Sequence, residues 1–225
     1  MILKFLKSGV SMRQIARILG VHRTTVARKR QFWSKQGIRF QKTFLKKEDH
    51  EIIRLIQIDD VETFEHTKCK PLSITMAVTN QRVILGAKVS KMPCKGRLAE
   101  FSRKEYGLRA DERRQNIAEL LKELSGVLRK DVTIVSDKSP FYPKAIQKYF
   151  PRAVHTTHRG RAPARTGQGE LKKGAYDPLF SINHTAAKMR DLIKPLTRKT
   201  WCTTKAKFGL EEHLNIFIAA HNSLI

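Results

Sequence analysis

Two short apolar segments, each running directly into aspartate, constrain the fold of this chain more than any other feature. Residues 51–58 (EIIRLIQI) are followed by Asp59 and Asp60, and residues 131–136 (DVTIVS) are followed by Asp137. Both segments have the length and the apolar or β-branched composition of buried strands. Carboxylates at the ends of two strands can converge when the strands are neighbours in one sheet. The pattern therefore predicts a polar site that the two strands build together.

The other periodic segments predict the remaining elements of an α/β domain over residues 49–225. Residues 72–79 and 82–90 are two further strands, joined by a tight turn at Asn80 and Gln81. Helices are predicted at residues 110–124, 140–149, 178–196 and 210–224. One more short strand is predicted at residues 152–156. This order predicts a single mixed sheet flanked by helices.

The N-terminal segment, residues 1–33, has the pattern of a small all-α domain. Ser11 and Gln14 have the spacing of a capping box, and Gly20 suits the positive φ of a tight turn between two helices. This layout predicts a helix-turn-helix whose second helix reads DNA, with residues 34–48 as a basic connector. The side chains of that helix expected to contact DNA are Arg23, Thr24, Thr25, Arg28 and Arg30.

The uneven charge distribution indicates a polyanionic partner. The formal net charge is +25, and residues 1–47 contain thirteen lysines and arginines but no aspartate or glutamate. A second stretch without acidic residues lies between Asp137 and Glu170. Solvated faces usually interleave both signs, so acid-free stretches around isolated carboxylates are typical of a nucleic-acid surface beside a metal site.

Composition argues against a membrane-spanning protein and indicates that the cysteines are reduced. No run approaches the ~18 apolar residues that a membrane-spanning helix needs, so we expect no membrane partner. The three cysteines, Cys69, Cys94 and Cys202, are odd in number and widely scattered, which is typical of reduced thiols in a cytosolic protein. The apolar fraction of 40% is sufficient for a packed core.

Five motifs resemble the small insertion-sequence transposases of the DDE class, most of all those of the insertion-sequence-one type. They are DDVETFEHTK at 59–68, VSDKSPFYP at 135–143, TGQGELKK at 166–173, DPLFSINHTAAKMR at 177–190 and RKTWCTTK at 198–205. The N-terminal IARILGV is similar to the helix-turn-helix core of transposases and resolvases. The resemblance covers nearly the whole chain and implies a ribonuclease-H-like catalytic domain.

The resemblance also implies a catalytic and metal-binding triad of Asp59, Asp137 and Glu170. Asp60 is the alternative first ligand, but Asp59 is preferred because strand alternation places it on the same, more polar face as Gln57. Some relatives carry the glutamate on the following helix, near the position of Asn183, so the third ligand stays open.

Metal-dependent cleavage and rejoining of DNA explains why carboxylates are needed. Two Mg²⁺ or Mn²⁺ ions ~3.5–4 Å apart activate the attacking oxygen and stabilise the leaving oxygen, and Mg²⁺ prefers oxygen ligands. Basic residues around the triad are expected to hold phosphates. They are Lys138, His155, His158, Arg159, Arg161, Arg165, Lys172 and Lys173.

The expected partners are the terminal inverted repeats of the element and the target, both double-stranded DNA. Pairing two ends needs a homodimer or a higher synaptic complex, and the expected location is the bacterial cytoplasm, at the nucleoid. Two other hypotheses stay open: an inactive remnant or helix-turn-helix regulator that only binds DNA, and a nuclease or junction resolvase of the same fold. Among single residues, His184, His213 and Trp201 are expected to pack in the core, with stacking on an unpaired base as the alternative for Trp201.

Overall fold

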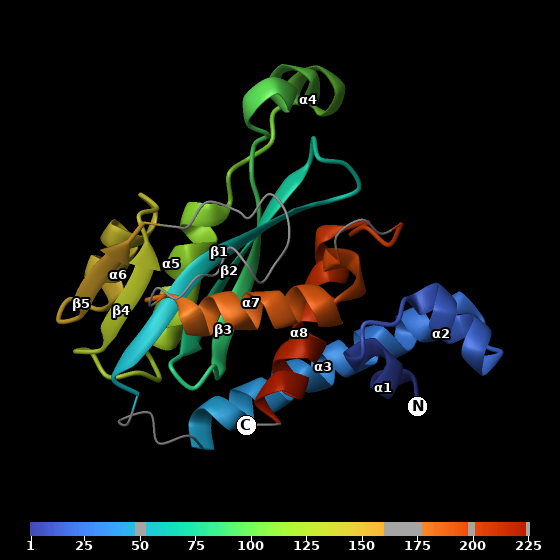
Figure 1. Cartoon of the computed structure of the whole chain (residues 1–225), viewed down its shortest axis with the longest axis horizontal. Coiled ribbons are helices and arrows are strands. Elements are labelled where there is room, and N and C mark those ends of the chain that lie inside the picture. The colour runs from blue at the N-terminus through green and yellow to red at the C-terminus, as the bar shows by residue number, and fades with distance from the viewer. Residues whose placement is uncertain (48–52, 160–176, 198–200, 224–225) are drawn as a thin grey trace.

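The computed structural model describes residues 1–47, 53–159, 177–197 and 201–223. One five-stranded sheet forms the centre, helices cover both of its faces, and three N-terminal helices lie beside it (Figure 1). The prediction of an α/β architecture around a single mixed sheet is therefore confirmed.

The sheet has the strand order β3-β2-β1-β4-β5. Strands β1 and β2 and strands β2 and β3 pair antiparallel, whereas β4 lies parallel to β1, and β5 lies parallel to β4. The strand bounds are Leu55–Phe64 for β1, Pro71–Thr79 for β2, Ile84–Lys91 for β3, Thr133–Asp137 for β4 and Val154–His158 for β5.

Strand β1 is longer than the sequence pattern predicted, because it does not end at Asp59. It pairs with β2 from Ile56 opposite Thr79 to Phe64 opposite Pro71. The long, almost fully buried β2 supplies backbone partners on this whole length, so the two aspartates do not terminate the strand. Asp59 and Asp60 therefore lie in mid-strand, while Asp137 is the last residue of β4 as expected.

Helices form a layer on each face of the sheet and complete two hydrophobic cores. Helices α5 (Arg113–Leu124) and α6 (Tyr142–Tyr149) cover one face, and α7 (Phe180–Leu192) and α8 (Lys207–Asn222) cover the other. The 3-10 turns η2 (Gly96–Leu98) and η3 (Lys194–Leu196) precede α4 and follow α7. Helix α4 (Ala99–Tyr106), which the sequence patterns did not predict, stands away from the sheet (Figure 1).

The N-terminal helices are α1 (Ile2–Lys7), α2 (Met12–Leu19) and α3 (Arg23–Lys47). Both bonds of the predicted capping box form: Gln14 N donates to Ser11 Oγ at 3.3 Å, and Ser11 N donates to Gln14 Oε1 at 3.1 Å. Gly20 ends α2 with a φ of 62°. Leu6, Ile15 and Val26 share a core with Ile216 of α8, so these helices pack directly on the sheet domain.

Residues 34–47, expected as a connector, continue α3 as a helix of 25 residues. Gly37 lets α3 approach α8 closely, because a Cβ there would lie 2.6 Å from the carbonyl oxygen of Asn215. Asn215 Nδ2 also donates to Ser34 Oγ at 3.1 Å, and Asn222 Nδ2 donates to Gln41 Oε1 at 2.9 Å. The segment is thus a packed helix because α8 offers it a complementary surface.

Candidate active site

The parallel pairing of β1 and β4 brings Asp59 and Asp137 together. The register of the two strands runs to Ile58 opposite Ser136, and the next residue along each strand is one of these aspartates. In strands, alternate residues share a face. Asp59 therefore points to the same side of β1 as Gln57, and Asp137 to the same side of β4 as Val135, which belongs to the core under α7 and α8.

Helix α7 is attached to this face by Gln57. The side chain of Gln57 donates from Nε2 to the carbonyl oxygen of Pro178 at 2.9 Å and accepts at Oε1 from the backbone N–H of Ile182 at 2.9 Å. Gln57 is buried, so both bonds are shielded from water. The first turn of α7 is consequently held beside the strand that carries Asp59.

Asp60 occupies the opposite face of β1. It accepts a hydrogen bond from the hydroxyl group of Thr75, which lies directly across from it on β2. The buried phenol of Tyr142 lies beside it, and burial together with the charges of Asp60, Asp59 and Asp137 raises the pKa of Tyr142. By strand alternation Asp59 shares a face with Asp137, although the charge of Asp60 also reaches Asp137 and raises its pKa.

The two aspartates lie in an environment that disfavours their charged forms, chiefly because they are partly buried. Burial raises the pKa of Asp59 to about 6; the charges of Asp137 and Asp60 add to the rise, while the N–H of Asp60 and the charge of Arg190 oppose it. Burial also raises the pKa of Asp137, against a hydrogen bond of 3.0 Å from the N–H of Ser139. Partly buried carboxylates that repel one another are a suitable oxygen donor set for a divalent cation.

The structure does not identify the third ligand of the expected triad. Glu170 lies outside the described residues, as do Arg161, Arg165, Lys172 and Lys173. Within the described ranges, no group of three histidine, cysteine, aspartate or glutamate side chains could hold a metal ion. The helical alternative, Asn183, is exposed on α7 and donates from Nδ2 to Asp177 Oδ2 at 3.0 Å.

Arg190 is a residue of this site that the sequence patterns did not single out. Its positive charge lowers the pKa of Asp59, so its guanidinium lies in the field of the aspartates. The signal available in the sequence was its spacing: Arg190 comes seven residues after Asn183, about two helical turns, on the same side of α7. A single arginine in a chain this basic did not stand out.

Two of the predicted phosphate-binding cations lie at the same edge of the sheet as Asp137. Asp137 pairs with His158 across β4 and β5, and the next residues along the two strands are Lys138 and Arg159, both exposed. His155 lies further from this edge. Its Nε2 is 2.8 Å from Ser136 Oγ, and burial lowers its pKa, so we expect a neutral, structural imidazole.

The proposed DNA-reading residues divide into two groups. Arg23, Thr24, Thr25 and Arg28 are exposed at the start of α3. The expectation that Arg30 also points outward is wrong. Its guanidinium donates from Nε to Glu212 of α8 at 2.7 Å and is only 11% exposed, because α8 covers that side of α3.

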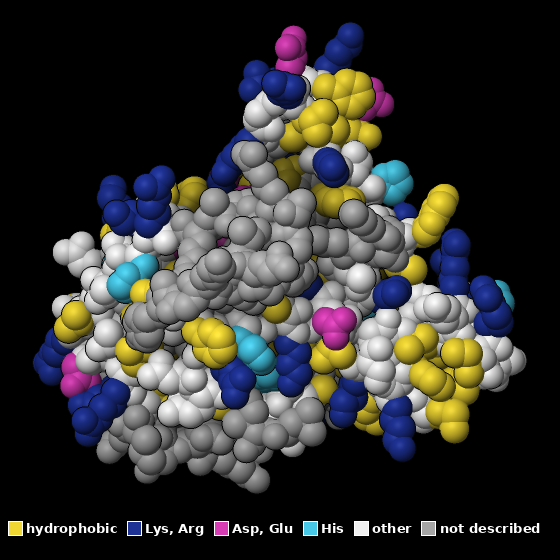
Figure 2. Space-filling view, in the orientation of Figure 1, with side chains coloured by type: hydrophobic (Ala, Val, Ile, Leu, Met, Phe, Trp, Pro, Cys, Tyr) yellow, Lys and Arg dark blue, Asp and Glu magenta, His cyan; other side chains and the backbone are white. Residues whose placement is uncertain are grey.

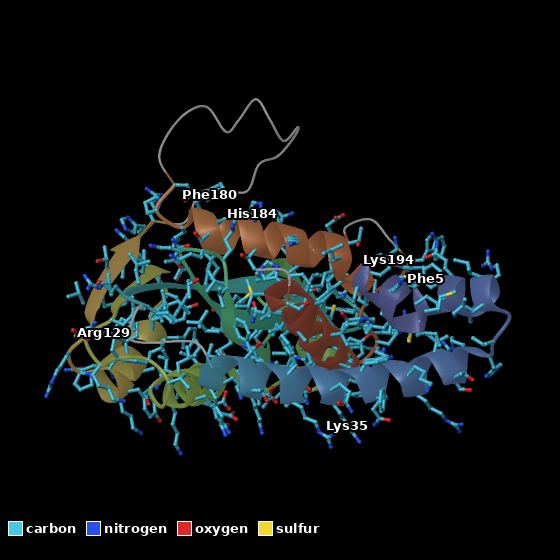
Figure 3. All side chains as sticks on the ribbon, turned by 90° about the horizontal axis from the view of Figure 1, so that it is seen from below. Phe5, Lys35, Arg129, Phe180, His184 and Lys194 are labelled. Atoms are coloured by element: carbon cyan, nitrogen blue, oxygen red, sulfur yellow. The ribbon has the colours of Figure 1, made fainter. Side chains whose placement is uncertain are left out.

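Of the three residues expected in the core, only His213 is buried. Burial, followed by the charge of Arg30, lowers its pKa to about 3, so it is a neutral packing residue. His184 is exposed on α7, where its ring lies 5.8 Å from that of Phe180 (Figure 3). Trp201 is 98% exposed and therefore lies outside the core.

Comparison with models of known protein families and with curated proteins finds no match for the chain. Across the described residues, each helix is either too short or too polar to cross a lipid bilayer.

Proposed function

We propose that this chain is a DDE-class transposase that cleaves and rejoins DNA at the ends of its own element. The observation that carries the proposal is the pair Asp59 and Asp137: two partly buried carboxylates on neighbouring parallel strands, beside an edge with exposed cations. The strand order, with β2 alone antiparallel to the rest of the sheet, is compatible with a ribonuclease-H-like fold. The five sequence motifs support the same class.

In this proposal Asp59 and Asp137 hold divalent ions, with Glu170 as third ligand and Asn183 as its alternative. Mg²⁺ or Mn²⁺ held by these carboxylates would supply activation of the attacking oxygen and stabilisation of the leaving oxygen of the phosphodiester. The exposed cations Lys138 and Arg159 hold the DNA phosphates at the sheet edge. Arg190 offsets part of the repulsion between the carboxylates and the DNA.

The N-terminal helices supply the recognition of the element ends as a helix-turn-helix domain. Arg23, Thr24 and Thr25 at the N-terminus of α3 are placed for base edges and phosphates, and Arg28 for the DNA backbone. The supporting observations are the capped α2, the tight turn at Gly20 and the exposure of these four side chains. Two element ends must be paired, so the active form is a homodimer or a larger complex on double-stranded DNA.

The test is a cleavage assay with purified protein and a supercoiled plasmid that carries the DNA flanking the gene. Wild type and Asp137→Asn are compared with Mg²⁺, Mn²⁺ or EDTA. Asp131→Asn is the matched control, since Asp131 is an exposed carboxylate just before the same strand, paired with Arg129 at 2.5 Å. We expect metal-dependent cuts at the repeat ends from wild type and from the control, and none from Asp137→Asn. Equal cutting by both variants would exclude Asp137 from the site.

The second candidate is a regulator or inactive remnant that binds DNA without cutting it. It needs only the exposed Arg23, Thr24, Thr25 and Arg28 at the start of α3, and no metal site. Specific binding of the repeats by wild type without cleavage under any metal condition would support this candidate. Cleavage away from the repeats would instead indicate a nuclease or junction resolvase.

A further inference from the structure

Helix α3 presents a cationic stripe, formed by Arg28, Lys35, Arg39, Lys42 and Lys46, on its outer side. All five side chains are exposed, and they follow one another at intervals of seven, four, three and four residues. At 3.6 residues per turn and 1.5 Å per residue, they lie within roughly 60° of the helix circumference and span roughly 27 Å. Figure 3 shows Lys35 projecting from α3 on the side away from α8.

The opposite side of α3 is packed, so the stripe has a fixed position relative to the candidate active site. Ser34 and Gly37 contact Asn215 of α8 as described above. Gln41 donates from Nε2 to the carbonyl oxygens of Ile84 at 2.8 Å and Leu85 at 3.3 Å, which attaches the helix to β3. Helix α3, which carries the stripe, is therefore packed on the sheet domain as well as on the N-terminal helices.

The spacing of the stripe is unfavourable for the helix by itself. Lys35 and Arg39, and Lys42 and Lys46, are four residues apart, and Arg39 and Lys42 are three apart, so like charges are neighbours on the helix surface. Helix α3 contains no acidic residue that could separate them. A helix face that only meets water usually mixes both signs. A polyanion bound along the stripe would remove the repulsion.

We propose that the part of the cationic stripe from Lys35 to Lys46 binds the phosphate backbone of a second stretch of double-stranded DNA, apart from the stretch read by the start of α3. The inference rests on the proposed function, since it assumes a DNA-binding chain. At 1.5 Å per residue α3 is about 37 Å long, whereas a major groove about 12 Å wide and about 8.5 Å deep takes up only its first turns. The four cations from Lys35 to Lys46 lie beyond those turns.

Other occupants fit the stripe less well. In a two-fold contact between copies of this chain, stripe would face stripe, and the like charges would repel. A membrane surface would need a continuous apolar side of α3 to insert among lipids. The packed side of α3 is used by α8, and the exposed apolar side chains Phe32, Ile38 and Phe40 are spread around the helix.

The experiment compares DNA binding by wild type and by a stripe variant that combines Lys35→Gln, Arg39→Gln, Lys42→Gln and Lys46→Gln. Arg28 is retained because it lies at the proposed reading end. The control variant combines Lys95→Gln, Arg97→Gln, Arg103→Gln and Lys104→Gln, which removes the same charge from exposed positions in and before α4. Binding to a labelled 40-base-pair duplex of arbitrary sequence is measured by fluorescence anisotropy over a salt series.

We expect the slope of log affinity against log salt to become less steep by up to about 3.6 in the stripe variant, about 0.9 for each phosphate that the variant no longer neutralises. The control variant should retain at least three quarters of the wild-type slope. The melting temperature of the stripe variant should equal or exceed that of wild type, because repulsion along α3 is relieved.

The outcomes separate this inference from the proposed function. If wild type binds the duplex and the stripe variant binds it with the same slope, the inference fails while the proposed function stands. If wild type binds no duplex at all, both fail. Loss of self-association in the stripe variant, seen by sedimentation without DNA and with no change in the DNA slope, would assign the stripe to a second copy and overturn the inference.

Discussion

Asp59 differs in its surroundings from most acidic side chains of the described ranges. Asp111 and Asp131 each accept hydrogen bonds from a nearby arginine, which lower their pKa values. Asp59 has the charge of Arg190 in its field, but burial and the charges of Asp137 and Asp60 outweigh it and raise its pKa to about 6. The folded protein thus maintains an unfavourable carboxylate cluster, which is typical of functional sites.

The first residue-scale prediction concerns Asp59→Asn in metal-free protein. The folded pKa of about 6 lies above the ordinary aspartate value of 3.8, so the folded state holds this proton more tightly than the unfolded state. The wild type therefore loses stability as pH rises from about 4 to about 6. We expect the variant to be more stable than wild type by roughly 1–3 kcal/mol at pH 8, with the difference vanishing below about pH 4. Urea unfolding in EDTA at both pH values measures this, and a difference independent of pH would contradict the prediction.

The second residue-scale prediction concerns Mg²⁺. An ion that binds only the folded protein raises its stability by mass action, by about 2.7 kcal/mol at one hundred times the dissociation constant. Millimolar Mg²⁺ should therefore raise the melting temperature of wild type at pH 8, but not that of Asp59→Asn or Asp137→Asn. Ca²⁺ and Asp131→Asn serve as controls for the ion and for the lost charge. An equal shift in all variants would show that Mg²⁺ binds elsewhere.

At the scale of elements, α3 and α8 form the contact that joins the N-terminal helices to the sheet domain. Their interface combines a close backbone approach at Gly37 with the ion pair of Arg30 and Glu212, whose atoms lie 2.6 Å apart. Both features lie on the inner side of α3, and the exposed cations lie on the outer side. One helix therefore has a structural face and a face free for a partner.

Gly37→Ala tests the close approach. Alanine favours an isolated helix by about 1 kcal/mol over glycine. Here its Cβ would lie 2.6 Å from a backbone oxygen of α8, which cannot move without shifting the helix. We expect a net loss of roughly 1–3 kcal/mol in the free energy of unfolding. Lys35→Ala, on the exposed side of the same helix, should leave stability within about 0.5 kcal/mol. A more stable Gly37→Ala protein would show that α3 and α8 do not pack this closely.

Arg28→Ala and Arg30→Ala should separate DNA binding from stability. Removing Arg30 leaves the largely buried Glu212, 16% exposed, without its partner, so we expect a loss of about 2–3 kcal/mol, below the 3–5 kcal/mol of a fully buried pair. Arg28 is exposed, so its replacement should weaken DNA binding with little effect on unfolding. Chemical denaturation and anisotropy titrations measure the two effects, and equal behaviour of the two variants would contradict the assignment.

At the scale of the whole molecule, the proposed reading end of α3 and the candidate active site belong to one packed body. The N-terminal core includes Ile216 of α8, and α8 in turn covers the sheet face that carries Asp59. Figure 2 shows several groups of lysine and arginine side chains on the described parts of the visible face, with few acidic ones beside them. A DNA end bound by the N-terminal helices would therefore be held at a set distance from the carboxylates.

Limited proteolysis tests this packing. Trypsin cuts after lysine and arginine, and a flexible connector over residues 34–47 would be cut first at its exposed cations. A packed helix should resist cleavage at Lys35, Arg39 and Lys42 until the whole protein unfolds. The sites of the earliest cuts, identified by mass spectrometry, check the prediction. Early cleavage at these three positions would indicate that the N-terminal helices move independently.

Local patterns predicted most of the elements and singled out two residues of the candidate site, Asp59 and Asp137. The spacing of Ser11 and Gln14 predicted a capping box that forms, and the apolar runs placed β2, β3 and β4 within a few residues of their observed bounds. These signals are readable because capping, strand alternation and helix periodicity depend on residues close together in the chain. Convergence of the aspartates was expected on the condition that their strands are neighbours, and β1 and β4 meet this condition.

Contacts between residues distant in the chain decided the rest. Glu212 lies 182 positions after Arg30, and no local pattern predicts that this arginine points inward to meet it. The continuation of α3 through residues 34–47 depends on the surface that α8 offers, and the extension of β1 past Asp59 depends on the length of β2. Burial is a property of the assembled layers, so only the tertiary structure could place Trp201 outside the core and set Thr75 and Tyr142 beside Asp60.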